Sequence, residues 1–239
     1  MEQTRDSYLR RLLNSLRQVL SATNSLEAGL YPALRIPVRF RPYAPADFET
    51  CVDIYQKNEP GRFPPNQLSD FEATLRHDAK TLIVAEIDSK VAGFGGVTFF
   101  EPNSAILYYG IVDPAFQGRR IGTTLTLLRI AQFPAHSPYV VVMIFAVDAS
   151  IPFYHRFGFS EIGRWKSKDG ANHPVGFLKV DNATIRRIRA KLERRGVRVD
   201  GNLDLPHKVN KLFEVRESLD GSVSVKFRRP EKDNNTSSE

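Results

Sequence analysis

The stretch that most constrains the fold is an apolar run followed by a turn, a glycine-containing loop and a helical pattern. Residues 106–112 form the apolar run and are expected to be a buried strand. A turn at Asp113-Pro114 follows, which a central strand would not tolerate. Gly118 and Gly122 lie in the loop, and apolar residues at helical spacing come with it: Ile121, Leu125, Leu128 and Ala131. A helix that opens after such a loop presents unpaired N–H groups at the positive end of its dipole, which predicts a phosphate or pyrophosphate site.

A second motif lies further along the chain. Residues 139–147 form a continuous apolar run, too short to span a membrane and typical of a strand buried on both faces. Asp148 or Ser150 is expected to cap the short helix that follows, which would end near Gly158. Tyr154 lies on this helix, in the phrase Phe153-Tyr154-His155-Arg156-Phe157-Gly158-Phe159. Taken alone, Tyr154 is most simply explained as a packed aromatic residue.

Taken together and in this order, the two motifs resemble those of the GCN5-related N-acetyltransferase (GNAT) family. The loop is similar to the family's acetyl-CoA pyrophosphate motif, Q/R-x-x-G-x-G/A, at Gln117 and Gly122. The phrase around Tyr154 is similar to its F/L-Y-x-x-x-G-F signature. The resemblance covers about residues 36–180 and implies an enzyme, an acyltransferase that uses acetyl-CoA as co-substrate and acetylates a primary amine. It also implies a mixed, twisted α/β sheet with helices on both faces, which the order of strands and crossover helix predicts as well.

The resemblance assigns roles to individual residues. Tyr154 would be the general acid, because a phenol can donate its proton to the departing CoA thiolate. A backbone N–H of the strand before the loop, that of Ile111 or Val112, would donate to the thioester oxygen. The residues expected to bind acetyl-CoA are Ile111, Val112, Gln117, Gly118, Arg119, Arg120, Ile121, Gly122, Thr123 and Phe153.

The acceptor side is less defined. By the resemblance, the loop of residues 57–67, which includes Arg62 and Phe63, would shape the acceptor site. The candidates for a general base are Glu86, Glu101, Tyr108 and Tyr109, each of which also fits a surface or packing role. The identity of the amine does not follow from the sequence, because loops that determine specificity carry no transferable code.

Two positions depart from the family pattern. Arg120 stands where the family usually has its first glycine, and a positive φ at that position would strain an arginine. Val147, with Asp148 next to it, occupies a position where many members have asparagine. These departures motivate a second hypothesis, a non-catalytic CoA-binding or interaction protein of the same fold whose cofactor site has drifted.

Segments on both sides of residues 36–180 are expected to be extensions. An apolar stripe over residues 1–35 predicts a helix that packs on the domain or on a second subunit, as in a homodimer; membrane-surface binding is the alternative. Residues 181–229 form a basic extension and residues 230–239 a polar tail that is expected to be disordered. The Arg-rich segment 183–198 raises the alternative of nucleic-acid binding, although a solvated helix face explains it more simply.

Composition limits the other classes of protein to which this chain could belong. The 239 residues include no stretch long and apolar enough for a transmembrane helix, and the N-terminus lacks the layout of a signal peptide. Cys51 is the only cysteine, which excludes an intrachain disulfide and predicts a reducing, cytoplasmic location. Its position on an apolar helix face predicts core packing. The five histidines show no ligand spacing, so no metal site is predicted.

Overall fold

The computed structural model describes residues 36–59, 67–101, 103–134, 138–166, 172–205, 207–209, 213–218 and 223–227. Three expectations lie outside these residues: the helix within residues 1–35, the acceptor-loop residues Arg62 and Phe63, and the tail of residues 230–239. Among the helices described, none is long and apolar enough to cross a membrane.

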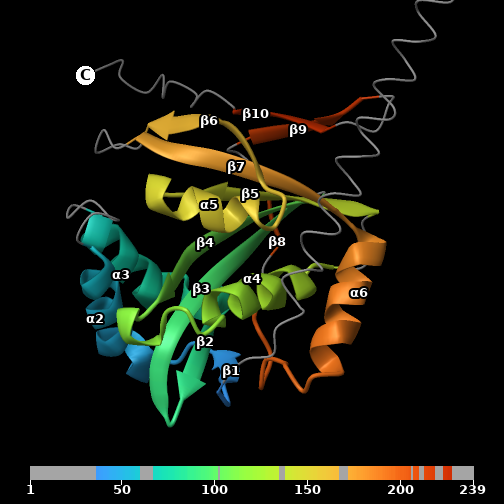
Figure 1. Ribbon diagram of the computed structural model, residues 1–239. Helices are drawn as coiled ribbons and strands as arrows, with labels where there is room; N and C mark the ends of the chain where they lie inside the picture. Colours follow the sequence, from blue (N-terminus) through green and yellow to red (C-terminus); the bar gives the residue numbers. More distant parts are fainter. Residues whose placement is uncertain are drawn as a thin grey trace, which may run out of the picture.

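An eight-stranded mixed sheet forms the centre of the molecule (Figure 1). The strands run in the order β1-β2-β3-β4-β5-β7-β6, and β8 pairs with β3 beside this path. They are β1 (Arg39–Pro42), β2 (Leu82–Ile87), β3 (Lys90–Glu101), β4 (Ser104–Val112), β5 (Tyr139–Phe145), β6 (Ser160–Lys166), β7 (Asn172–Asp181) and β8 (His207–Val209). All pairs are antiparallel except β4–β5 and β3–β8. The sheet is therefore the mixed α/β type that the sequence predicts.

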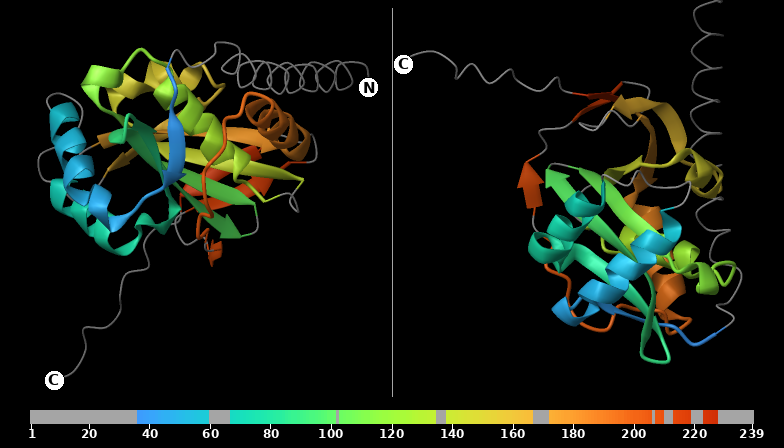
Figure 2. Two further views of the ribbon diagram at one scale, coloured as in Figure 1. Left: turned by 90° about the horizontal axis from the view of Figure 1, so that it is seen from below. Right: turned by 90° about the vertical axis from the view of Figure 1, so that its left-hand side faces the viewer.

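Helices cover both faces of this sheet, as expected (Figure 2, left). They are α2 (Phe48–Asn58), α3 (Leu68–His77), α4 (Ile121–Ala131), α5 (Ile151–His155) and α6 (Asn182–Glu193). Residues of β2 alternate between the two cores: Leu82 and Val84 pack with α2 and α3, whereas Ile83 and Ala85 pack with α4 and α6. This alternation follows from the two-residue period of a strand.

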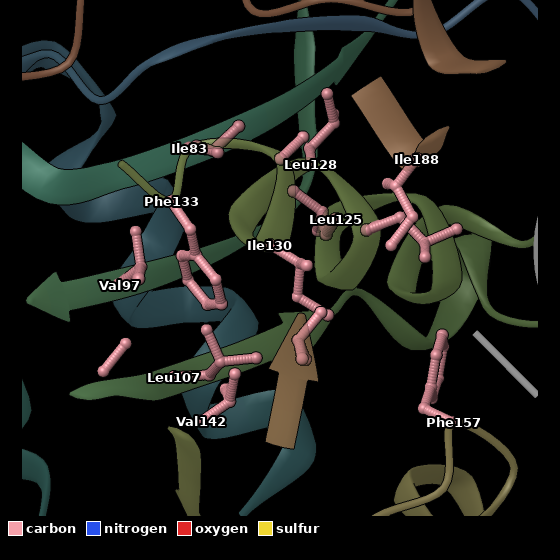
Figure 3. Close-up of a cluster of buried hydrophobic side chains, with 14 of the residues drawn as sticks. Ile83, Val97, Leu107, Leu125, Leu128, Ile130, Phe133, Val142, Phe157 and Ile188 are labelled. Atoms are coloured by element: carbon pink, nitrogen blue, oxygen red, sulfur yellow. The ribbon is translucent and has the colours of Figure 1, made fainter. Parts of the chain in front are cut away.

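The larger core lies between the sheet and α4. Figure 3 shows Leu125, Leu128 and Ile130 of α4 in one cluster with Ile83, Val97 and Leu107 of the sheet. Ile188 of α6 packs against the same cluster, so that α6 closes its outer side. Burying side chains of this size is the main term that holds the helices on the sheet.

Cys51 belongs to the second core, between α2, α3 and the sheet. Its side chain is fully buried, and this burial raises the pKa of the thiol to about 12. A thiol in this state is a poor nucleophile. The prediction that Cys51 packs in the core is confirmed.

Four strands were not predicted. β6 carries few apolar residues and is mostly exposed, and β7 is its only main-chain partner among the described strands. β8 adds to the end of β3, and β9 (Phe213–Glu217) pairs with β10 (Val223–Phe227) in a separate two-stranded sheet. Phe213 and the valines of this hairpin cover the face of β5 and β7 opposite α4. The basic C-terminal segment is thus partly sheet.

The central sheet opens between β4 and β5. These two strands pair in parallel only from Ser104 to Leu107, opposite residues 141–144. Beyond that point β4 continues to Val112, with a shift in its register against β3 and a left-handed φ of 45° at Tyr109. The short helix α5 follows at the open end of β5 (Figure 1).

Candidate active site

Two pockets meet where β4 and β5 separate. We call the first the α4 pocket: it has a volume of about 450 Å³ and lies at the N-terminus of α4, between Gln117 and Phe153. The second, the α3 pocket, has a volume of about 480 Å³ and extends from the opening to Thr74 of α3 and His173 of β7. Both pockets are lined by Gly110, Val112, Val147, Ser150 and Tyr154. Both volumes lie in the range of small-molecule sites, and the shared residues make them two compartments of one site.

The α4 pocket is built on backbone N–H groups. Gly118 and Arg120 both adopt left-handed conformations, with φ of 75° and 66°, and α4 begins directly afterwards. The first helical hydrogen bond is that from Thr124 N to Arg120 O, at 3.0 Å. The N–H groups of residues 121–123 therefore precede the helical ladder and lie at the positive end of the helix dipole. This is the strand, loop and helix junction that the sequence predicts.

Side-chain charge in the α4 pocket has one sign. Arg120, Arg129 and Arg156 line it, and no acidic residue is among the described residues that do so. Positive side chains and helix N-terminal N–H groups both stabilise an anion. The pocket is thus suited to a ligand that carries phosphate groups.

Arg120 adopts the left-handed backbone conformation that would strain an arginine at this position. Left-handed backbone costs a residue with a β-carbon about 1–2 kcal/mol, whereas glycine adopts it freely. We expect Arg120→Gly to raise the free energy of unfolding by about 1 kcal/mol and the melting temperature by roughly 2–4 °C.

Arg119→Gly is the matched control for that variant. Arg119 is adjacent and exposed, and it is not among the residues with positive φ. Glycine at this position gains no relief of strain and only adds freedom to the unfolded chain, so a loss of stability is expected. Thermal unfolding of the two variants measures the difference, and equal changes in both would contradict the assignment of strain to Arg120.

Most residues predicted to bind acetyl-CoA line the α4 pocket. They are Val112, Gln117, Gly118, Arg120, Ile121, Gly122, Thr123 and Phe153. Two do not: Ile111 lines the α3 pocket, and the guanidinium of Arg119 lies 5.3 Å from the ring centroid of Phe116. The amide of Gln117 donates inward, to Asn58 Oδ1 and to Val112 O, both at 3.1 Å. Gln117 therefore connects the loop to the end of β4.

Tyr154 lies at the junction of the two pockets. Its ring packs edge-on against Phe153 and Phe159, with centroids 5.1 and 5.5 Å apart. A β-carbon built on Gly110 would lie 3.3 Å from the Tyr154 hydroxyl, so the absence of a side chain at Gly110 leaves that hydroxyl accessible. The phenol thus combines a packed ring with a hydroxyl at the opening, and the packing and acid roles are compatible.

The candidate bases occupy different places. Glu86 is paired with Arg41 at 2.8 Å, on the β1–β2 edge, and lines neither pocket. The side chain of Glu101 is outside the described part of the chain. Tyr108 and Tyr109 do line the α3 pocket, and burial raises the pKa of both phenols. Both are therefore protonated at neutral pH, which leaves them poor bases.

Sequence reasoning missed several residues of this site, among them His173 and Arg129. His173 lines the α3 pocket and its Nε2 lies 2.9 Å from Gln67 Nε2, although no motif marks it in the sequence. Arg129 lines the α4 pocket from within the core. In α4 it follows Leu125 by four residues on the buried side, and that spacing was the signal available. Among the described residues, no group of three or more His, Cys, Asp or Glu could hold a metal ion.

The position where many family members have asparagine carries no charge into the site. Val147 lines both pockets, whereas Asp148 is absent from the lining of either. Asp148 is paired with Arg164 of β6, and this hydrogen-bonded pair lowers the pKa of the Asp148 carboxyl. The Asp148 carboxylate is therefore engaged outside the pockets, on the exposed surface.

The split sheet, the helix N-terminus and the tyrosine signature coincide with a family match. Residues 48–159 match the model of the acetyltransferase (GNAT) family. This part of the chain is a GNAT acetyltransferase domain. The matched residues run from the start of α2 to the end of the Tyr154 signature, so they include both motifs and most of both pockets. The fold class and the family expected from the sequence are confirmed.

Solved structures similar to the GNAT domain include acetyltransferases from several organisms. Ard1 from Thermoplasma volcanium is 18% identical, with 61% of this chain and 99% of that chain covered and a TM-score of 0.49. N-acetylglutamate synthase from Neisseria gonorrhoeae, in complex with coenzyme A and N-acetyl-glutamate, is 15% identical, with 62% and 36% covered and a TM-score of 0.47.

Diaminobutyrate acetyltransferase EctA from Paenibacillus lautus, in complex with L-2,4-diaminobutyric acid and coenzyme A, is 13% identical. The coverage is 62% of this chain and 96% of that chain, with a TM-score of 0.46. A comparison with curated proteins by sequence finds no match.

Proposed function

We propose that this protein is an acetyl-CoA-dependent N-acetyltransferase that acts on a primary amine, with Tyr154 as the general acid. The observation that carries the proposal is the pair of connected pockets. One compartment has N–H groups and arginines for phosphates, and the other leads to a separate side of the sheet. A two-substrate transfer needs this arrangement, because the reacting groups must meet at the point that both compartments share.

The residues present fit acetyl-CoA. The N–H groups of residues 121–123 and the side chains of Arg120 and Arg156 would hold its pyrophosphate. The apolar residues that border both compartments, Val112 and Val147, would lie along its pantetheine arm. The amine acceptor would occupy the α3 pocket, which is lined by apolar side chains and by polar groups that include Asp78, Thr74 and His173.

The chemistry is a direct transfer. The amine nitrogen attacks the thioester carbonyl, the C–N bond forms, the C–S bond breaks and its electron pair goes to sulfur. Tyr154 donates its proton to that sulfur. A backbone N–H near the end of β4, at Ile111 or Val112, would stabilise charge on the carbonyl oxygen. The proton released by the amine passes to a base or water chain on the α3 side, where His173 is the imidazole that lines the pocket.

Acetyl-CoA binding is tested by thermal unfolding with increasing acetyl-CoA, on the wild-type protein and on Arg120→Gly. A ligand at about 100 times its Kd adds about 2.7 kcal/mol of stability, which corresponds to roughly 5–10 °C for a chain of this length. We expect both proteins to shift. A shift in Arg120→Gly alone would favour the non-catalytic hypothesis of a drifted site, and no shift in either would reject the proposed co-substrate.

A further inference from the structure

The guanidinium of Arg129 is buried in the core of the GNAT domain without a carboxylate partner. Its residue is 1% exposed, and none of the ion pairs formed by the described residues includes it. Instead it donates to neutral oxygens: Leu125 O at 3.2 Å, Gly96 O at 3.3 Å, Tyr108 O at 3.4 Å and Thr126 Oγ1 at 3.2 Å. A buried charge is costly unless it is compensated, and here these hydrogen bonds engage four of the five N–H donors while the net charge remains.

Two glycines make room for this guanidinium. A β-carbon built on Gly95 of β3 would lie 3.0 Å from the Cζ of Arg129. A β-carbon built on Gly110 of β4 would lie 3.1 Å from its Nη2. Both distances are shorter than ordinary van der Waals contacts, so the two strands accommodate Arg129 only because side chains are missing there.

The recess opens at Tyr154. The same point on Gly110 that lies 3.1 Å from Arg129 Nη2 lies 3.3 Å from the Tyr154 hydroxyl. The hydroxyl and the guanidinium attract each other, which partly opposes the lowering of the Arg129 pKa by burial. An arginine stays protonated through such a shift, because its usual pKa is far above neutral. The positive charge that lines the α4 pocket therefore extends to the junction with the α3 pocket.

We propose that Arg129 is a fixed positive charge that stabilises the negative charge on the CoA sulfur as the thioester breaks. This rests on the proposed function, under which the C–S electron pair moves to sulfur and Tyr154 then protonates it. Before that proton transfer Arg129 faces a developing thiolate, and afterwards it faces the tyrosinate oxygen. A charge held in place before the reaction, away from water, acts more strongly than one in solvent.

The test measures the ionisation of the CoA thiol when CoA, without an acetyl group, is bound to the full chain. Ultraviolet absorbance of the thiolate is recorded against pH, with S-methyl-CoA, which cannot ionise, as the reference for the protein's own tyrosines. Cys51 adds no competing signal near neutrality, because burial raises its pKa to about 12. We expect the bound thiol to titrate about 1–3 pH units below free CoA, as groups do beside an opposite charge.

Variants separate a charge effect from a packing role. Arg129→Met keeps most of the side-chain volume and is expected to abolish the shift, while Arg129→Lys restores part of it and Tyr154→Phe retains it. A role limited to packing would change the melting temperature of Arg129→Met without moving the thiol titration.

Each outcome is decisive. If wild-type protein binds CoA and the thiol titrates as in free CoA, the inference is overturned even if Arg129→Met does not fold. A shift that survives in folded Arg129→Met overturns it too. If CoA does not bind at all, the proposed function fails and this inference with it, which calorimetry distinguishes from binding without a shift.

Discussion

Replacing Tyr154 by phenylalanine is expected to lower turnover by about 10²- to 10⁴-fold, the usual contribution of a positioned acid. The ring contacts with Phe153 and Phe159 do not involve the hydroxyl, so the fold and the KM for acetyl-CoA should change little. The measurement is the rate of CoA release, with an acceptor found by screening primary amines. The kcat and KM values of Tyr154→Phe are compared with those of the wild type.

Tyr139→Phe is the matched control for that experiment. Tyr139 lies at the start of β5 and lines neither pocket. Its substitution also removes a phenolic hydroxyl, but one outside the site. It should retain wild-type turnover. A Tyr154→Phe enzyme whose kcat stays within about threefold of the wild type would contradict the acid role, since a positioned acid contributes far more.

Arg41→Met is expected to reduce the free energy of unfolding by about 3–5 kcal/mol. Arg41 donates to both carboxylate oxygens of Asp47, at 2.7 and 2.9 Å, and to Glu86 at 2.8 Å. The Asp47 side chain is only 8% exposed, so removing the guanidinium leaves a buried carboxylate next to a second one. The loss is measured by denaturant unfolding, with ΔG extrapolated to water.

Arg39→Met provides the comparison on the same strand. Arg39 also pairs with Glu86, at 3.6 Å, but its side chain is 56% exposed. Exposed pairs contribute little to stability, because solvent screens them. The loss in free energy of unfolding should therefore be several-fold larger for Arg41→Met than for Arg39→Met. Equal losses in the two variants would contradict the claim that burial makes the Arg41 ion pairs important for stability.

The parts of the fold that the sequence predicts are those with strong local periodicity. The meander of β1 to β4, the crossover helix α4 and the buried strand β5 each match an apolar pattern and a turn signal. The turn at Asp88-Ser89 even shows the two positive φ values, 45° and 61°, that a tight hairpin requires. Local pattern and tertiary structure agree there.

The strands that were missed depend on partners rather than on their own pattern. β6 has Ile162 and Trp165 as its large apolar residues, and it is a strand because β7 offers an edge. The β9–β10 hairpin does alternate, with Val215 and Val225 facing the same cluster, but its charged residues favoured interpretation as a basic extension. Distant pairing decided both cases.

The sequence motifs predict the strand, loop and helix that form the site, but they do not predict the buried charge of Arg129. Gly118, Gly122 and Tyr154 lie where the motifs place them, because a strand, a loop and a helix follow each other in sequence. Arg129 was missed because an arginine in a helical pattern is normally exposed. Only the glycines of two neighbouring strands, Gly95 and Gly110, make its burial feasible, and their approach depends on the assembled sheet.

Hydrogen exchange of the backbone amides, measured with and without acetyl-CoA, locates the bound ligand on the chain. We expect slower exchange in residues 117–125 and 147–157, which border the α4 pocket, and no change in α6, which contributes no lining residue to it. Acetyl-CoA that leaves exchange in residues 117–125 unaltered, or that protects another part of the chain most strongly, would contradict the assignment of this cleft as the acetyl-CoA site.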